Sequence, residues 1–434
     1  MRKIAFYTLG CKVNQSDTAS MERLFREAGY EIVDFAEKAD IYLINTCVVT
    51  NMGQRKSRQM IHRAIRKNPN AFIVVSGCYP QTAAEEVKAI QGVDLIIGNQ
   101  DRAAVVTLVE AAATEQSIDA YDNVKKLSAQ TAFEELSADC ETEKTRSFLK
   151  IQEGCNQFCT YCIIPYARGP LRSRSLENIK DEVEKLVAAG FSEVVLIGIH
   201  LGAYGKELKN GTSLTDAVKA ALAVTGLARV RLGSLESVEV GEDLLDLMAS
   251  DERVQRQLHL PLQTGCDDVL KSMHRPYDTK IFAELIQKIR AKLPDVAITT
   301  DVIVGFPGET EENFAATKEF VRSCGFSKIH IFPFSPRKGT PAASFSGVVS
   351  EKVKQRRAEE LAEVDRESHE KYCESMLDKT VTVLFEQESA EGLWEGLSGN
   401  YVRVYAKSED NLSGKIRKIT LKDLYKDGMI GEIL

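Results

Sequence analysis

Short apolar runs alternate with longer segments that carry apolar residues at helical spacing along the first quarter of the chain. The runs predict strands at residues 3–9, 40–45, 71–76 and 94–97. The longer segments predict helices at residues 16–28, 54–67 and 82–90, with a fourth from residue 101. This order predicts a doubly wound α/β domain with a parallel sheet over residues 1–112.

The same alternation begins again at residue 146, after a polar, acidic stretch (113–145) that we expect to be a linker with some helix. Six strands are predicted, at residues 147–152, 193–198, 229–233, 257–262, 297–304 and 328–332. Six β/α units make three quarters of an eight-stranded barrel. We therefore expect a partial (β/α)6 barrel whose chemistry lies at the carboxyl ends of its strands.

The last part of the chain changes character. Residues 351–377 are charged and lack Gly and Pro, so they predict a connecting helix, and the central domain is expected to cover 146–372. Residues 373–434 contain short strand-like runs separated by glycines, at 380–386, 401–406 and 416–421. Such spacing is typical of a small β-barrel.

Composition and charge limit the possible functions. The 434 residues are 44% hydrophobic and 27% charged, as in ordinary globular proteins. The net charge of −7 excludes a globally basic nucleic-acid coat, so any RNA contact must come from local cationic patches. No run approaches the ~20 apolar residues of a membrane span, and no signal-peptide cleavage site follows the first residues. We expect a cytoplasmic protein without membrane contact, and a monomer.

Three of the ten cysteines form a tight C-x3-C-x2-C cluster: Cys155, Cys159 and Cys162. Three thiolates on one loop can hold three corners of a four-iron cluster and leave one iron open for a reactive ligand. Structural zinc normally takes four ligands, and no fourth Cys or His lies nearby in the sequence. An iron–sulfur cluster is favoured over zinc and over three unrelated buried thiols.

Three other cysteines are far apart in sequence, but each follows a predicted strand: Cys11, Cys47 and Cys78. The carboxyl ends of parallel strands meet at one edge of a sheet, so these thiols are expected to form a second three-thiolate site. The alternative is that they are small packing residues at strand ends. Cys140, Cys266, Cys324 and Cys373 are expected to be bystanders.

Several motifs resemble those of the radical S-adenosylmethionine (SAM) methylthiotransferase family, and the resemblance covers nearly the whole chain. They are GCNQFCTYCIIPYARGPLRSRS at 154–175, HLPLQTG at 259–265 and TDVIVGFPGET at 300–310. The spread cysteines are similar to those of the family's N-terminal domain, and the tail resembles its RNA-binding TRAM barrel. The segment TLGCKVNQ at 8–15 is most similar to the branch that modifies N6-threonylcarbamoyladenosine at position 37 of tRNA.

The resemblance implies two [4Fe-4S] clusters, and SAM used both as radical source and as methyl donor. The cluster on Cys155, Cys159 and Cys162 would cleave SAM, and the resulting radical would take hydrogen from carbon 2 of the adenine. The cluster on Cys11, Cys47 and Cys78 would deliver sulfur. The tRNA anticodon loop, an electron donor and a sulfur source are the implied partners.

Five residues are candidates for contact with SAM. Tyr161 lies between two ligands, where the family's aromatic residue lies near the adenine. The others follow predicted strands: Gly198, His200, Ser234 and Glu236. Packing or capping at a strand end is the competing interpretation for each of them.

Two cation-rich stretches are candidate RNA contacts. Residues 51–70 contain six cations and no acid: Arg55, Lys56, Arg58, Arg63, Arg66 and Lys67. Residues 144–174 contain a single acid, Glu153, and six cations: Lys144, Arg146, Lys150, Arg168, Arg172 and Arg174. A solvated helix face is the alternative for the first stretch. The tail is slightly acidic overall, but Lys407, Arg403, Lys415, Arg417, Lys418, Tyr401 and Tyr405 are candidates for one RNA-binding face.

Three rival functions remain open at this point. The same chemistry could act on isopentenyladenosine in tRNA or on an aspartate of a ribosomal protein. A non-catalytic iron–sulfur RNA-binding regulator and a zinc protein are alternatives of another class.

Overall fold

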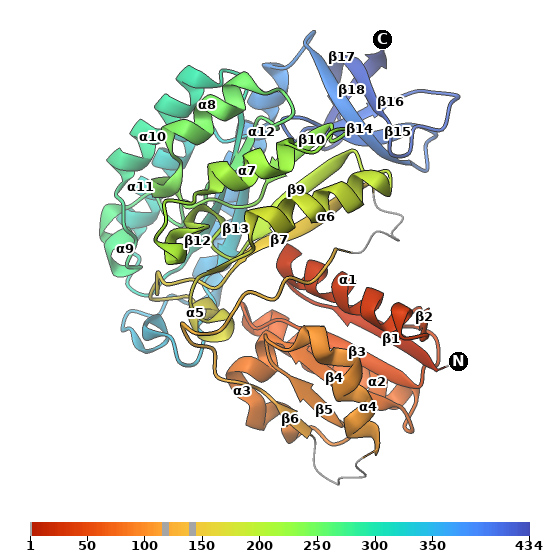
Figure 1. The fold of residues 1–434 in the computed structure, drawn as a ribbon. Helices are drawn as coiled ribbons and strands as arrows, with labels where there is room; N and C mark the ends of the chain where they lie inside the picture. Colours follow the sequence, from red (N-terminus) through yellow and green to blue (C-terminus); the bar gives the residue numbers. More distant parts are fainter. Residues whose placement is uncertain (1, 115–120, 139–144) are drawn as a thin grey trace.

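The N-terminal domain is a parallel six-stranded sheet in the order β2-β1-β3-β4-β5-β6 (Figure 1). The computed structural model describes residues 2–114, 121–138 and 145–434. The strands of this sheet are β1 (Lys3–Thr8), β2 (Glu31–Val33), β3 (Ile41–Thr46), β4 (Phe72–Gly77), β5 (Leu95–Ile97) and β6 (Tyr121–Asn123). Its helices are α1 (Lys12–Glu27), α2 (Asn51–Lys67), α3 (Cys78–Lys88) and α4 (Val105–Thr114), with a 3-10 turn η1 (Arg102–Ala104).

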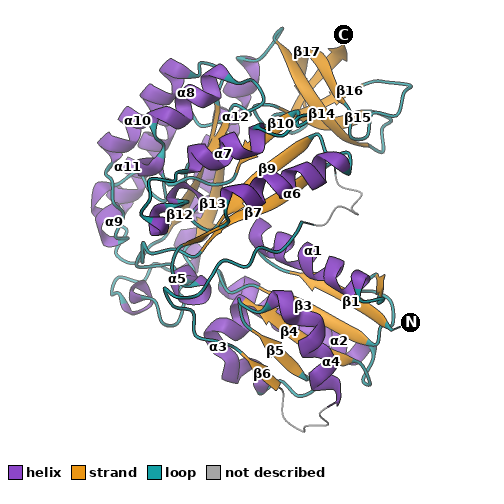
Figure 2. Cartoon of the chain, in the orientation of Figure 1, coloured by secondary structure: helices purple, strands orange, loops and turns teal. Residues whose placement is uncertain are grey.

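Helices cover both faces of this sheet because its inner strands are apolar on both sides (Figure 2). Met21 of α1 and Val109 of α4 pack on one face with Leu43. Ile61 of α2 and Val87 of α3 pack on the other. The predicted doubly wound fold is confirmed.

The segment expected to be a linker behaves differently from the prediction in its described part. Residues 121–123 form strand β6, which pairs in parallel with β5. No helix occurs within residues 121–138. The strand escaped prediction because it is short and polar, and its position depends on the exposed edge of β5. Cys140 and Lys144 lie outside the described residues.

The central domain contains the six predicted parallel strands, so the partial barrel is confirmed. They are β7 (Arg146–Glu153), β9 (Glu193–Gly198), β10 (Arg229–Leu232), β11 (Gln257–His259), β12 (Ala297–Val304) and β13 (Lys328–Pro333). Bridges between Val230 and Val254 and between Ser234 and His259 join the two halves of the barrel. A short strand, β8 (Arg172–Ser173), pairs antiparallel with β7.

Helices surround the outside of these strands (Figure 1). They are α6 (Leu176–Ala188), α7 (Leu214–Leu222), α8 (Glu242–Ser250), α9 (Asp267–Ser272), α10 (Thr279–Lys292), α11 (Glu311–Cys324) and α12 (Glu351–Glu374). The short helix α5 (Ile164–Arg168) instead packs on the N-terminal domain. The 3-10 turns are η2 (Leu201–Ala203), η3 (Lys206–Leu208), η4 (Ser237–Glu239) and η5 (Pro341–Ser344). Apolar residues of the strands and helices form one continuous core.

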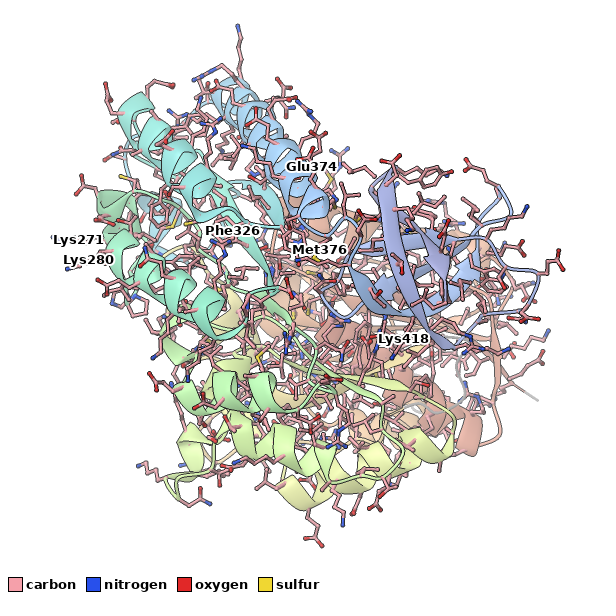
Figure 3. All side chains as sticks on the ribbon, turned by 90° about the horizontal axis from the view of Figure 1, so that it is seen from above. Lys271, Lys280, Phe326, Glu374, Met376 and Lys418 are labelled. Carbon is pink, nitrogen blue, oxygen red and sulfur yellow. The ribbon has the colours of Figure 1, made fainter. Side chains whose placement is uncertain are left out.

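The C-terminal domain is a closed five-stranded barrel in the order β14-β15-β16-β18-β17. Its strands are β14 (Thr380–Glu388), β15 (Trp394–Ser398), β16 (Arg403–Ala406), β17 (Ile416–Tyr425) and β18 (Gly428–Ile433). Helix α12 leads into it, and Met376 beyond Glu374 is buried in its core (Figure 3). Arg231 of β10 ties it to the central domain by donating to the carbonyl oxygens of Ser398 and Gly399, both at 3.1 Å.

The small barrel was predicted, although two of its strands, β15 and β18, were not. Both contain glycine, which weakens the sequence pattern of a strand. Among the helices of the described ranges, none combines the length and the apolar character needed to cross a membrane.

Candidate active site

The structure brings the three spread cysteines together at the carboxyl edge of the N-terminal sheet. Cys11 follows β1, Cys47 follows β3 and Cys78 is the first residue of α3. Burial, together with the charges of Cys78 and Cys11, raises the pKa of Cys47 to about 11.

Glycines with positive φ turn the chain just before three of the cysteines. Gly10, Gly77 and Gly154 have φ values of 101°, 96° and 79°, and each directly precedes a cysteine. A Cβ on Gly10 would lie 2.9 Å from Cys47 Sγ, and one on Gly154 would lie 1.8 Å from the oxygen of Pro170. Only glycine therefore fits these turns.

Buried amides fix the loops of this first triad. Asn14 Nδ2 donates to the carbonyl oxygens of Leu9 at 2.7 Å and Thr46 at 3.0 Å, joining the ends of β1 and β3. Asn99 Nδ2 lies 3.5 Å from Cys78 Sγ and donates to the carbonyl oxygen of Ala167 in α5 at 2.7 Å. The triad is thus tied to the helix that follows the other cysteine cluster.

The second triad lies on the loop between β7 and α5. Cys155 Sγ is 3.4 Å from His200 Nδ1, and Arg275 Nη1 donates to Cys159 Sγ at 3.2 Å. Burial raises the pKa of Cys162 to about 12, with a further effect from Cys159 and Cys155. Nine cysteines of the described residues are free thiols.

Three of the predicted SAM contacts surround this loop. Tyr161 OH lies 3.5 Å from Arg275 Nη1, and Glu236 accepts two hydrogen bonds from Arg275 Nη2 at 2.5 and 2.7 Å. His200 Nε2 lies 2.9 Å from Glu239 Oε2. Burial opposes protonation of His200, but hydrogen bonds with Cys155 and Glu239 outweigh it and raise its pKa to about 10.

The other two predicted contacts have different surroundings. Gly198 packs against Gln152, to which a Cβ on the glycine would approach within 2.9 Å, and Gln152 Oε1 accepts from the backbone N–H of His200 at 2.6 Å. Ser234 is exposed and lines the larger cavity described below.

Arg275 and Glu239 were missed by sequence reasoning, because an isolated charge outside a motif carries no local signal.

The spacing of the sulfurs distinguishes the triads from a single-ion site. In the described part of the chain, the one group of three or more His, Cys, Asp or Glu ligand atoms within 4.8 Å of one another is His259, Asp301 and His330. Neither cysteine triad is that compact. A tetrahedral zinc ion with Zn–S bonds of ~2.3 Å would hold its sulfurs ~3.8 Å apart. Each triad offers three thiols, which is the donor set of a four-iron cluster with one open iron.

A cavity of about 240 Å³ lies between the two cysteine loops; we call it the smaller cavity. Tyr161 and Cys162 line it from the second triad, and Val49 and Thr50 line it from the segment that follows Cys47. The rest of its wall comes from β12, β13 and their loops, including Asp301 and Phe332. Cys162 of the second triad and the segment after Cys47 thus border on one open cavity.

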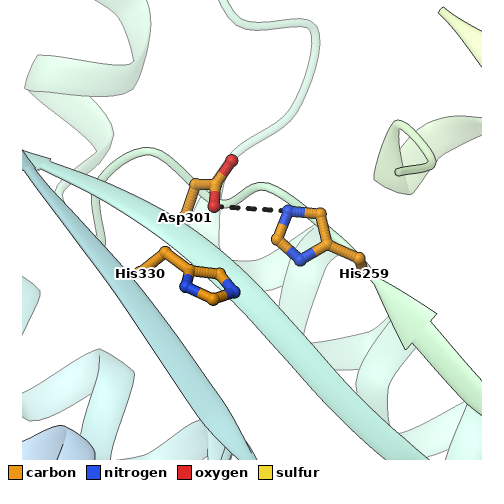
Figure 4. Close-up of side chains that lie close together, drawn as sticks. All are labelled: His259, Asp301 and His330. Atoms are coloured by element: carbon orange, nitrogen blue, oxygen red, sulfur yellow. Dashed lines mark ion pairs between the residues drawn. The ribbon is translucent and has the colours of Figure 1, made fainter. Parts of the chain in front are cut away.

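A cavity of about 540 Å³, the larger cavity, occupies the partial barrel beside the C-terminal domain. Asp301 and Phe332 line it as well as the smaller cavity. Figure 4 shows the cluster on its wall, where His259 Nε2 lies 3.3 Å from Asp301 Oδ1 and His330 faces the same space. Thr299 Oγ1 lies 2.8 Å from His259 Nδ1. Burial lowers the pKa of His330.

The second cation-rich stretch does not form an RNA-binding surface in its described part. Lys150, Arg168, Arg172 and Arg174 are buried. Lys150 Nζ lies 2.5 Å from Asp17 and 3.0 Å from Glu153. The prediction was wrong for these residues because their charges are used inside the fold. Asp17 from another domain and Glu153 pair with Lys150 and Arg168, whereas Arg172 and Arg174 donate to backbone carbonyl oxygens. By contrast, Arg55, Lys56, Arg63, Arg66 and Lys67 are exposed on α2, which begins beside the smaller cavity.

Known proteins similar to this chain agree with the architecture. Residues 3–98 match the uncharacterized protein family UPF0004, and residues 149–321 match the radical SAM superfamily. The solved structure of the radical SAM methyltransferase TsrM from Kitasatospora setae superposes with a TM-score of 0.59 at 16% identity, over 79% of this chain and 77% of that one. This likeness shows the fold.

Curated relatives match nearly end to end. The threonylcarbamoyladenosine tRNA methylthiotransferase MtaB of Bacillus subtilis is 41% identical over 97% of this chain and 94% of that protein. MtaB of Aquifex aeolicus is 39% identical over 89% of this chain and 93% of that protein. A tRNA-2-methylthio-N(6)-dimethylallyladenosine synthase of Pseudothermotoga lettingae is 32% identical over 98% of each chain.

The barrel and its matched domain define a radical SAM enzyme. Within that class, the chain belongs to the methylthiotransferase family, with MtaB proteins among its relatives.

Proposed function

We propose that this enzyme converts N6-threonylcarbamoyladenosine at position 37 of tRNA into its 2-methylthio derivative. The activity named for the MtaB relatives, which are 41%, 39% and 35% identical, supports this substrate. The observation that carries the reaction is the smaller cavity, which is lined by Cys162 and by the segment after Cys47. A group held at one triad and a group held at the other would share that space.

In this proposal each cysteine triad holds one [4Fe-4S] cluster and leaves one iron open. The cluster on Cys155, Cys159 and Cys162 supplies reductive cleavage of SAM, and the cluster on Cys11, Cys47 and Cys78 supplies the sulfur. Carbon 2 of adenine is neither acidic nor electrophilic, which makes radical chemistry suitable.

The remaining site residues orient the bound groups. Arg275 connects Cys159 with Glu236, so it fixes the carboxylate beside the cluster loop. His200 and Gln152 connect Cys155 with the end of β9. Tyr161, Gly198, His200 and Glu236 are therefore proposed to surround SAM, with Ser234 facing the barrel interior.

We further propose that the exposed cations of α2 bind the phosphates of the anticodon loop. A single-stranded loop allows the target base to leave the stack and enter the barrel. An electron donor and a sulfur source complete the cycle, and the cytoplasm, where tRNA is modified, is the expected location.

Nucleoside mass spectrometry tests this function. The anaerobically reconstituted enzyme, with SAM and a reductant, is incubated with tRNA from a strain that lacks the gene. We expect threonylcarbamoyladenosine to gain a methylthio group. Threonylcarbamoyladenosine that stays unchanged while isopentenyladenosine is methylthiolated would contradict the proposal. A protein with intact clusters that forms no 5′-deoxyadenosine would instead be a non-catalytic regulator.

A further inference from the structure

The larger cavity has no role in the chemistry proposed above, although all three domains line it. Lys12 reaches it from the N-terminal domain, His259 and His330 from the barrel strands, and Tyr401 and Arg403 from the C-terminal domain. It adjoins the smaller cavity through their shared wall. A base inserted between the triads would therefore have room for a substituent in the larger cavity.

The charges that line this cavity are paired, with one exception. Lys328 Nζ lies 2.5 Å from Asp365, and Arg403 Nε lies 3.1 Å from Asp427. Asp301 contacts His259. Within the described residues, Lys12 has no carboxylate partner.

Lys12 faces aromatic rings instead of an acid. Its Nζ lies 5.8 Å from the centroid of the Phe148 ring. Burial opposes ionisation of Tyr401, yet Lys12, Arg146 and Arg231 outweigh it and lower the pKa of that phenol. Arg146 and Arg231 are paired with Glu386 and Glu193, so Lys12 is the cation of this wall that an anionic ligand can neutralise.

We infer that Lys12 binds the carboxylate of an acidic amino-acid substituent on the substrate adenosine and so selects that substrate over one with an apolar substituent. This inference rests on the proposed function. A threonylcarbamoyl group ends in a carboxylate, and the ammonium group of Lys12, an exposed residue on the cavity wall, can form a charge-assisted hydrogen bond with it. A phosphate of the RNA backbone is the other source of the same anionic chemistry.

Two anticodon stem-loops distinguish these sources. One carries N6-threonylcarbamoyladenosine, and the other carries its primary carboxamide, which has nearly the same shape without the charge. With wild-type holoenzyme, kcat/KM for methylthiolation should be roughly 10- to 100-fold higher for the acid. Lys12→Gln should remove that preference by lowering kcat/KM for the acid alone, and Lys12→Arg should restore most of it.

Two controls separate this effect from damage to the neighbouring ligand Cys11. Lys12→Gln should keep the iron content of the wild type and its rate of SAM cleavage without RNA. Lys271→Gln, at an exposed position on α9 (Figure 3), should keep the preference for the acid.

The outcomes are distinct. An equal loss on both stem-loops would assign Lys12 to a phosphate and overturn the inference, and so would an unchanged preference. A wild-type enzyme that modifies neither stem-loop but modifies isopentenyladenosine would overturn the proposed function itself.

Discussion

Arg168, on the helix after Cys162, donates a hydrogen bond to Asp17, on the helix after Cys11, with Nη1 3.0 Å from Oδ2. Both side chains are buried at the interface of the N-terminal and central domains. Arg102 and Lys150 also contact Asp17, and Glu153 joins the same network. These buried ion pairs therefore fix the position of one cysteine loop relative to the other.

Removing Arg168 should destabilise the protein strongly. Arg168→Met leaves Asp17 and Glu153 with one cation fewer, and breaking a buried ion pair typically costs ~3–5 kcal/mol. The melting temperature of the metal-free protein measures the effect. Arg356→Met, which removes an exposed pair with Glu311, is the matched control and should change it little. Equal melting temperatures for the two variants would contradict the structural role of Arg168.

The same network should fail in acid. Burial opposes ionisation of Asp17 and Glu153, but their cationic neighbours hold both pKa values below the ordinary 3.8 and 4.5. The folded protein thus binds fewer protons than the unfolded chain, so this contribution is complete above about pH 4.5 and is lost as pH falls through the folded-state pKa values. Asp17→Asn should flatten the dependence of the melting temperature on pH below 4.5. A wild-type protein whose melting temperature rises on acidification would contradict this predicted pH dependence.

Gly154→Ala should disrupt the loop of the second triad. Its added Cβ would meet the Pro170 oxygen at 1.8 Å, in addition to the backbone strain at a φ of 79°. Gly190→Ala is the matched control, because its φ is 95° but no atom lies within 4 Å of the added Cβ. We expect the control to lose only ~1 kcal/mol, whereas Gly154→Ala should also lose iron during reconstitution. If Gly154→Ala retained as much iron as the control, the prediction would be wrong, because the loop could then move to relieve the contact with Pro170.

The two triads should have separable functions. Cys159→Ala should abolish 5′-deoxyadenosine formation, whereas Cys47→Ala should abolish methylthiolation but keep SAM cleavage. Each variant should lose about half of the iron, because each cluster has its own three ligands. Cys324→Ala, at a buried thiol on α11 away from both loops, is the control and should keep all the iron. Full methylthiolation by Cys47→Ala would exclude a second cluster on Cys11, Cys47 and Cys78.

Local sequence patterns determined the architecture of this protein. The six barrel strands and the placement of Cys11, Cys47 and Cys78 after strands were predictable, because periodicity and the shared carboxyl edge of a parallel sheet are properties of each segment. The strands β2, β6, β8, β15 and β18 escaped because they are short or contain glycine, and their pairing depends on neighbouring edges.

The tertiary structure decided which charges serve the fold and which face a ligand. Lys150 and Arg168 resembled RNA contacts in sequence, but Asp17 from another domain neutralises them. Arg275 reached Cys159 without any motif to predict it, and the TLGCKVNQ motif did not indicate that Lys12 lines a cavity shared by all three domains. Ion pairs and cavities arise between segments distant in sequence, so their energies depend on packing that no local pattern contains.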